Sequence, residues 1–233
     1  MSPIHYLAMA PSCWHFSGVD DPSRRPLKTR SMAWARSMSG KLSAAGFTPN
    51  TISALSVVFA ACGAAAYLAA GGKIPWAAGW ITGAACIQLR LICNLMDGMV
   101  AIEGGRKSVT GDLWNEIPDR LADGIFLVSA AWAVGLPWVG ALAAWAAVMT
   151  AYVRAMGASL TGIQDYCGPF AKPHRMAILT IASLLTAAEP AMGGIVPRGE
   201  IMRFALYLIA AGTCVTIFRR TRRLAARLKE AKP

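Results

Sequence analysis

The chain of 233 residues alternates long apolar runs with short polar segments. Six runs reach the roughly 20 mostly apolar residues that a helix needs to cross a bilayer. They cover about residues 52–70, 76–97, 115–135, 137–157, 174–192 and 200–218. Because the polar segments between them are short, the pattern favours one bundle over a string of domains. We therefore expect an all-α integral membrane bundle of six transmembrane helices.

Amphipathic spacing before the first run predicts one more helix. Between residues 31 and 45, apolar side chains recur near helical spacing with Trp34 among them, which is typical of a helix lying in the headgroup region. A cytoplasmic helix that packs on the bundle is the alternative. Residues 1–30 are expected to form a loose cytoplasmic leader, and residues 219–233 a basic cytoplasmic tail.

Composition and charge agree with a membrane protein. Of the residues, 55% are hydrophobic and 15% are charged, and the net charge is +11. The basic residues flank apolar runs, so we do not expect nucleic acid as a partner. In alternate loops the only basic residues are Lys73 and Arg198, and the positive-inside rule therefore predicts that both termini are cytoplasmic. The frequent use of Ala and Arg suggests a bacterium with a GC-rich genome, and the membrane would then be an inner membrane.

Half of the 12 acidic residues lie in the stretch from Asn94 to Asp123, where the end of the second apolar run joins the start of the third. Ionisable side chains are costly beside a membrane core, so such a density indicates a function. Two amide and three carboxylate side chains fall on two helix faces here, namely Asn94 with Asp97, and Asn115 with Asp119 and Asp123. Such oxygens suit a hard divalent cation, which commonly bridges protein ligands to phosphate. The sequence therefore predicts a cytoplasmic metal site for a nucleotide or pyrophosphate substrate.

Basic side chains enter the same level of the membrane from the fourth and fifth runs. We expect Arg154, Lys172 and Arg175 to bind a phosphate of the acceptor or of the donor lipid. Ordinary positive-inside anchoring is the alternative. Arg90 lies within the second run, where it should be paired or face a watery cavity, unless its side chain reaches the headgroups.

The acidic stretch resembles the CDP-alcohol phosphotransferase family, whose motif is Asp-x2-Asp-Gly-x2-Ala-Arg-x8-Gly-x3-Asp-x3-Asp. The spacing is kept throughout, and five of the eight motif positions match. The matching residues are Asp97, Gly98, Ala101, Gly111 and Asp119, and the departures are Asn94, Ile102 and Asn115. A Pro-Asn element before the first run, Pro49-Asn50, also fits the family, so the resemblance covers most of the chain after about residue 30.

The resemblance implies a transfer of substituted phosphate from a CDP-linked donor to an acceptor alcohol, with release of CMP, in phospholipid synthesis. It implies Mg²⁺ or Mn²⁺, one or two ions, and a homodimer, with residues 31–218 as the membrane domain. Asp97 would be a metal ligand, and Asp119 would be both the base toward the acceptor and a metal ligand. The residues near the nucleotide would be Asn50, Gly98, Ala101 and Gly111.

The three departures leave other functions open. Asn at positions 94 and 115 keeps a carbonyl oxygen but removes two negative charges, so a site built for two dications would now balance about one. Ile102 replaces an arginine, for which Arg106 or Arg120 is a candidate substitute. A catalytically silent relative that binds nucleotide or lipid is the second interpretation. The third is a small transporter, although the polar residues gather at one face and not at the midplane.

Overall fold

The computed structural model describes residues 32–103 and 110–230, and within these ranges the chain is helical, with no β-strand. Helices α1 to α7 and one short 3-10 helix, η2, make up most of the described residues. Their bounds are α1 Ala33–Ala44, α2 Pro49–Ala69, α3 Trp76–Glu103, α4 Gly111–Ala133, α5 Pro137–Thr161, α6 Lys172–Ala188, η2 Glu189–Met192 and α7 Glu200–Glu230. The expected all-α fold is therefore confirmed.

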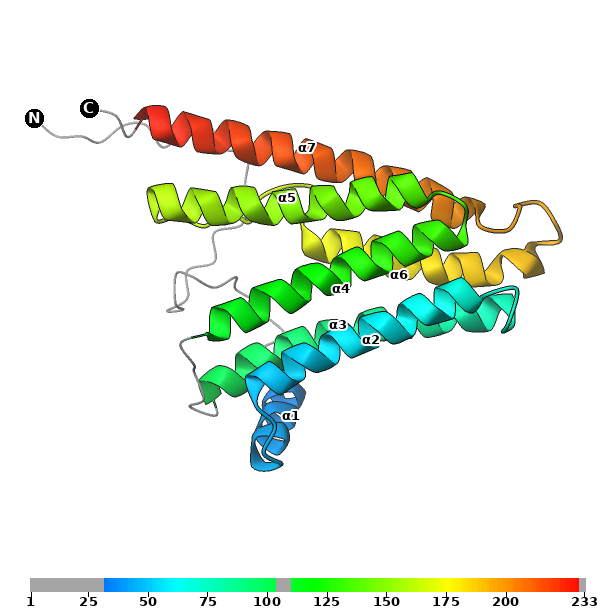
Figure 1. Cartoon of the computed structure of the whole chain (residues 1–233), viewed down its shortest axis with the longest axis horizontal. Helices are drawn as coiled ribbons and strands as arrows, with labels where there is room; N and C mark the ends of the chain where they lie inside the picture. Colours follow the sequence, from blue (N-terminus) through cyan, green and yellow to red (C-terminus); the bar gives the residue numbers. More distant parts are fainter. Residues whose placement is uncertain (1–31, 104–109, 231–233) are drawn as a thin grey trace, which may run out of the picture.

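The helices α2 to α7 run side by side along one axis, whereas α1 crosses the end of the bundle steeply (Figure 1). α4 lies between α2 and α5, which both pack against it, and α3 joins α2 to α6. At the end where α1 lies, α3 ends and α4 begins, and α5 ends and α6 begins (Figure 1). The polar segments that the sequence placed on one side of the membrane therefore share one end of the bundle.

Four helices in the described part of the chain are long and apolar enough to cross a membrane: α2, α3, α5 and α7. The predicted total of six spans is thus supported for four of them by length and composition. α4 begins with charged residues around Asp119, and α6 has only 17 residues. Both nevertheless lie alongside the four long helices in the bundle (Figure 1).

Several boundaries differ from those expected. α3 continues to Glu103, and α7 continues to Glu230, so the basic residues expected as a separate tail prolong the last helix. α2 begins at Pro49, with the Thr48 hydroxyl accepting a hydrogen bond from the Thr51 amide at 3.2 Å. The Thr48 side chain is thus the N-cap of α2. The expected leader, residues 1–30, lies outside the described residues.

Small residues allow the helices to approach closely. A Cβ atom at Gly63 would lie 2.5 Å from the ring of Phe126, and one at Gly79 would lie 2.7 Å from the Ala66 carbonyl oxygen. At Gly83 the obstacle is the ring of Tyr67, whose hydroxyl bonds the Ser183 hydroxyl at 2.6 Å. The close contacts join α2 to α3, α4 and α6.

The contact between α4 and α5 yields a stability prediction. A Cβ atom at Gly140 would lie 2.4 Å from the Ala131 Cβ and 2.8 Å from the Leu127 carbonyl oxygen, both on the rigid helix α4. We expect Gly140→Ala to lower the free energy of unfolding in detergent by about 1 to 3 kcal/mol through overpacking. Gly124→Ala is the control, because its Cβ would meet only the Ala144 Cβ at 3.9 Å. Equal denaturation curves for the two variants would contradict the prediction.

Candidate functional site

A buried carboxylate, Asp119 in the third turn of α4, is the centre of a network of charged side chains. Arg90 of α3 donates from Nη2 to Asp119 Oδ1 at 2.6 Å and to the Asp119 carbonyl oxygen at 2.8 Å. Lys172, the first residue of α6, donates from Nζ to the same Oδ1. Arg120 Nη1 lies 3.1 Å from the other oxygen, Oδ2. Three cations from three helices therefore hold one carboxylate.

Asn94 connects this carboxylate to one of its cations. With its amide oriented to satisfy both neighbours, the side-chain nitrogen donates to Asp119 Oδ1 at 3.2 Å. The side-chain oxygen accepts from Lys172 Nζ at 2.9 Å. An aspartate at this position would have no donor for Asp119, so the amide is the side chain that fits these two partners.

Asp97 lies one turn after Asn94 and has a different environment. Its side chain is buried and accepts hydrogen bonds from the Ser53 hydroxyl at 2.7 Å and from the Gly98 amide at 2.6 Å. Asp97 interacts electrostatically with Asp119 and Lys172, but within residues 32–103 and 110–230 it forms no ion pair. A buried carboxylate with only neutral hydrogen-bond donors is the kind of ligand that a cation stabilises.

Asp123 lies one turn after Asp119 on α4 and is also buried. Its Oδ1 is 2.5 Å from Arg90 Nη2, and its Oδ2 is 3.7 Å from Arg175 Nη2 of α6. Arg175 also donates to the Phe170 carbonyl oxygen at 2.8 Å. The predicted pairing of Arg90 is therefore confirmed, and Asp123 is held by two arginines.

Glu116 and Arg154 form the more exposed rim of the network. Glu116 pairs with Arg120 on α4, and its Oε1 accepts from Arg154 Nη2 of α5 at 2.7 Å. The Arg154 guanidinium also lies 5.3 Å from the centre of the Tyr166 ring, within the range of a cation–π contact. The rim thus ties α4 to α5 and to the segment that leads into α6.

The other predicted site residues lie around the same end of the bundle. Gly98 and Ala101 are half-buried in the last turns of α3, and Gly111 is half-buried at the start of α4. Asn50 is half-buried in the first turn of α2, whereas Asn115 is exposed on α4. No three His, Cys, Asp or Glu side chains converge on a common metal position within the part of the chain that the structure describes.

Sequence reasoning missed two partners of the predicted carboxylates. Arg90 was expected to be paired, but its partner Asp119 was not identified. The signal was that Arg90 lies four residues before Asn94, so the two side chains share one face of α3. Ile102, which occupies the arginine position of the motif, is exposed. Arg120, one of the two candidate substitutes for that arginine, does contact Asp119. Ser53, the partner of Asp97, gave no signal, because serines are common throughout the apolar helix α2.

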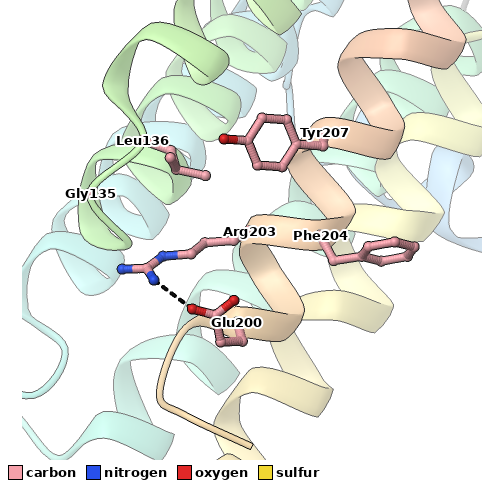
Figure 2. Close-up of a pocket in the computed structure, with 6 residues that line it drawn as sticks. All are labelled: Gly135, Leu136, Glu200, Arg203, Phe204 and Tyr207. Carbon is pink, nitrogen blue, oxygen red and sulfur yellow. Dashed lines mark hydrogen bonds and ion pairs between the residues drawn. The ribbon is translucent and has the colours of Figure 1, made fainter.

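A hollow lies at the end of the bundle opposite Asp119, where α4 turns into α5 and α7 begins. It measures about 530 Å³ and is lined by Gly135, Leu136, Glu200, Arg203, Phe204 and Tyr207 (Figure 2). Its arginine and glutamate pair with each other at 2.6 Å. We place the candidate site at the other end, because the motif positions Asp97 and Asp119 lie there.

Arg90, which contacts both Asp119 and Asp123, yields a stability prediction. We expect Arg90→Met to lower the free energy of unfolding in detergent by about 3 kcal/mol or more, because it leaves two buried carboxylates short of a cation. Arg203→Met is the control: it removes a half-exposed ion pair and one hydrogen bond to the Val134 carbonyl, worth about 1 kcal/mol. Chemical denaturation measures both, and an Arg90 variant as stable as the control would refute the argument.

Known proteins resemble this chain in sequence and in fold. No family model matches it. It is 34% identical over 126 residues to archaetidylinositol phosphate synthase of Methanothermobacter thermautotrophicus. That alignment covers 53% of this chain and 60% of the relative, so the match spans less than two thirds of that enzyme.

Solved structures that match include those of phosphatidylinositol phosphate synthase (PgsA1) from Mycobacterium tuberculosis. The complex with manganese and citrate has a TM-score of 0.65 at 17% identity, covering 82% of this chain and 88% of that one. The structure with CDP-DAG bound has a TM-score of 0.64 at 18% identity, covering 82% of this chain and 92% of that one. The comparisons thus give this chain the fold of those synthases and confirm its resemblance to the CDP-alcohol phosphotransferases.

Proposed function

We propose that this protein is a membrane phosphotransferase that moves a substituted phosphate from a CDP-linked lipid to an acceptor alcohol and releases CMP, in phospholipid biosynthesis. One observation carries the proposal. Asp97 and Asp119, the two acidic motif positions that the chain retains, come from different helices to the same end of the bundle and interact there. The fold shared with phosphatidylinositol phosphate synthase supports the same reaction.

The carboxylates differ in their fitness to hold a divalent cation. Asp97 has no cationic partner among the described residues, and Asn94, three residues away, would add its carbonyl oxygen by releasing the hydrogen bond from Lys172. Asn115, Asp119 and Asp123 complete the proposed set of ligands, although Asp119 and Asp123 have cationic partners already. We propose Mg²⁺ or Mn²⁺ as the ion, which would offset negative charge on the donor phosphates.

Asp119 is the proposed base. Its three cationic partners keep the carboxylate ionised, and an ionised carboxylate can accept a proton. The acceptor hydroxyl gives its proton to Asp119 as its oxygen bonds to the phosphorus of the donor. The bond between that phosphorus and the oxygen of CMP then breaks, and CMP leaves with the electron pair.

The nucleotide is proposed to lie against the ends of α3 and α4. Gly98, Ala101 and Gly111 have small side chains or none, which leaves the backbone open to a close neighbour. Asn50 would contact the nucleotide from α2, since Thr48 already caps that helix.

A phosphorylated polyol is the proposed acceptor. The curated relative is an archaetidylinositol phosphate synthase, and this chain carries basic side chains at the same end as Asp119. Arg154, Lys172 and Arg175 are the proposed phosphate ligands, of which Arg154 and Lys172 are partly exposed. Arg175 is buried and is proposed to order the start of α6 behind them.

A lipid donor has a suitable place beside the site. An apolar groove of about 520 Å³ runs between α2 and α4, lined by Ala64, Leu68, Arg120, Leu121, Gly124, Ile125, Val128, Ser129 and Trp132. Its one charged lining residue, Arg120, also contacts Asp119. An acyl or isoprenoid chain in this groove would therefore leave its phosphate at the charged network.

The proposed topology keeps six spans. α4 and α6 pack between helices that are long enough to cross, so we propose that they cross too. The exposed Trp34 and Met38 suit α1 to the headgroup region, with residues 1–30 as leader and residues 219–233 as basic tail. Both termini would be cytoplasmic, in a bacterial inner membrane. The homodimer stays a prediction.

Release of CMP tests the proposed function. We expect the purified protein to release CMP from CDP-diacylglycerol or its diether counterpart in the presence of inositol phosphate and Mg²⁺ or Mn²⁺. Asp97→Asn and Asp119→Asn should each lower kcat at least about 100-fold, the usual scale for loss of acid–base or metal catalysis. Glu200→Gln, at the opposite end of the bundle, is the control and should keep the wild-type rate.

The same assay weighs the silent relative. Its motivation is that three protein cations already occupy Asp119. If folded protein binds CDP-DAG tightly but releases no CMP with any alcohol tested, the interpretation as a catalytically silent relative is correct and the proposed enzyme activity is wrong.

The acceptor subsite gives a separate prediction. We expect Arg154→Gln to raise the KM for inositol phosphate about 10-fold or more, because a charge-assisted contact worth about 1.5 to 3 kcal/mol is lost. The KM for the CDP-linked donor should stay within about twofold. A rise confined to the donor KM would assign Arg154 to the donor phosphate instead.

A further inference from the structure

We infer that Arg220, near the end of α7, is a positioning residue that orients Arg154 for the acceptor phosphate. It acts through residues 162–171, the segment that joins α5 to α6 and that we call the α5–α6 segment. The inference rests on the proposed function, which assigns Arg154 to the acceptor, and it adds a residue that acts without touching the substrate.

The α5–α6 segment holds the Arg154 guanidinium in place. The Gln164 side-chain oxygen accepts from Arg154 Nη1 at 3.3 Å and from the Tyr166 hydroxyl at 2.6 Å. The centre of the Tyr166 ring lies 5.3 Å from the guanidinium carbon. Glu116 accepts from the other terminal nitrogen, Nη2, at 2.7 Å. Because a guanidinium binds phosphate through a rigid planar fork, the positions of Gln164 and Tyr166 set the direction of that fork.

Bonds to α7 fix the position of the α5–α6 segment. The segment is neither helix nor strand, so its backbone groups depend on neighbouring elements. α7 packs along α5 beside it (Figure 1). Arg220 donates from Nε to the Cys167 carbonyl oxygen and from Nη1 to the Thr150 carbonyl oxygen, both at 2.8 Å. Thr150 lies one turn before Arg154 on α5, so one guanidinium ties the segment to the helix that carries Arg154.

The two halves of the segment are held in different ways. The half nearer α6 packs tightly on α7, since a Cβ atom at Gly168 would lie 2.3 Å from Thr216 Cγ2. The half that carries the partners of Arg154 is held by the buried Arg220, with a longer ion pair of 3.4 Å from Asp165 to a second arginine of α7. Loss of the Arg220 bonds therefore loosens the half that orients Arg154 and leaves the other half packed.

Binding of inositol phosphate tests the inference without requiring catalysis. The Kd is measured by isothermal titration calorimetry on the detergent-solubilised full-length protein. Arg220→Lys keeps the charge but offers one nitrogen to two carbonyl oxygens. We expect its Kd to rise about 5-fold or more, the scale of one lost hydrogen bond, while the Kd for CDP-diacylglycerol stays within about twofold. Arg222→Lys, at an exposed position of α7, is the matched control and should keep the wild-type Kd.

A double variant separates positioning from general stability. Once Arg154→Gln has removed the side chain that is positioned, adding Arg220→Lys should change the Kd by less than about twofold. A residue that only stabilises the fold would weaken binding by the same factor in both backgrounds, and that result would refute the inference.

A second single variant keeps the test decisive if Arg220→Lys does not fold. Gln164→Leu removes the oxygen that Arg154 and Tyr166 share, and it should raise the Kd for inositol phosphate to a similar extent. A folded Gln164→Leu or Arg220→Lys protein with the wild-type Kd would overturn the inference.

CMP release, measured on the same wild-type sample, separates this inference from the proposed function. If the variants bind inositol phosphate as expected but the wild type releases no CMP, Arg220 keeps its positioning role and the phosphotransferase is rejected. If the wild type releases CMP and Arg220→Lys binds inositol phosphate normally, the phosphotransferase is retained and the positioning role is rejected. A wild type that binds no inositol phosphate also rejects the positioning role.

Discussion

The charge of Arg90 constrains the rest of the structure. Its side chain is fully buried in an apolar helix, where an unpaired charge is costly, and it reaches Asp119 and Asp123 one turn apart on α4. Pairing one nitrogen of this guanidinium with two carboxylates fixes both the distance and the rotation of α4 against α3. Arg175 then brings α6 to the same place through Asp123. The end of the bundle is therefore set by charge, while the rest is set by packing of small residues.

Buried ion pairs are a poor source of stability, because desolvation offsets most of the attraction. Apolar side chains of similar volume would pack these helices at least as well. Stability alone therefore does not account for Arg90, Asp119 and Asp123 at this end of the bundle. The same network leaves Asp97, which hydrogen-bonds the Ser53 hydroxyl and no cation that the structure describes, as the carboxylate available to a ligand.

Most of the fold was predictable from the sequence, because each helix in lipid must satisfy its own backbone and so appears as one apolar run. The boundaries were less accessible. α7 continues to Glu230, since nothing between the apolar run and the basic residues breaks a helix. The acidic positions were predictable from spacing within α3 and α4. The link from Lys172 to Asn94 was not, since it joins segments 78 residues apart and depends on how α6 packs on α3.

The two retained motif carboxylates lie in two different environments. Asp119 is surrounded by Arg90, Arg120 and Lys172, which hold it ionised and fixed in direction. Asp97 has the Ser53 hydroxyl and the Gly98 amide as partners, which orient it without neutralising it. Asp119 is therefore held in one direction with its charge compensated, whereas Asp97 is oriented and keeps its charge uncompensated by the residues that the structure describes. The substitution at Asn94 sharpens this division, because its amide binds Lys172, a cationic partner of Asp119, and adds no charge beside Asp97.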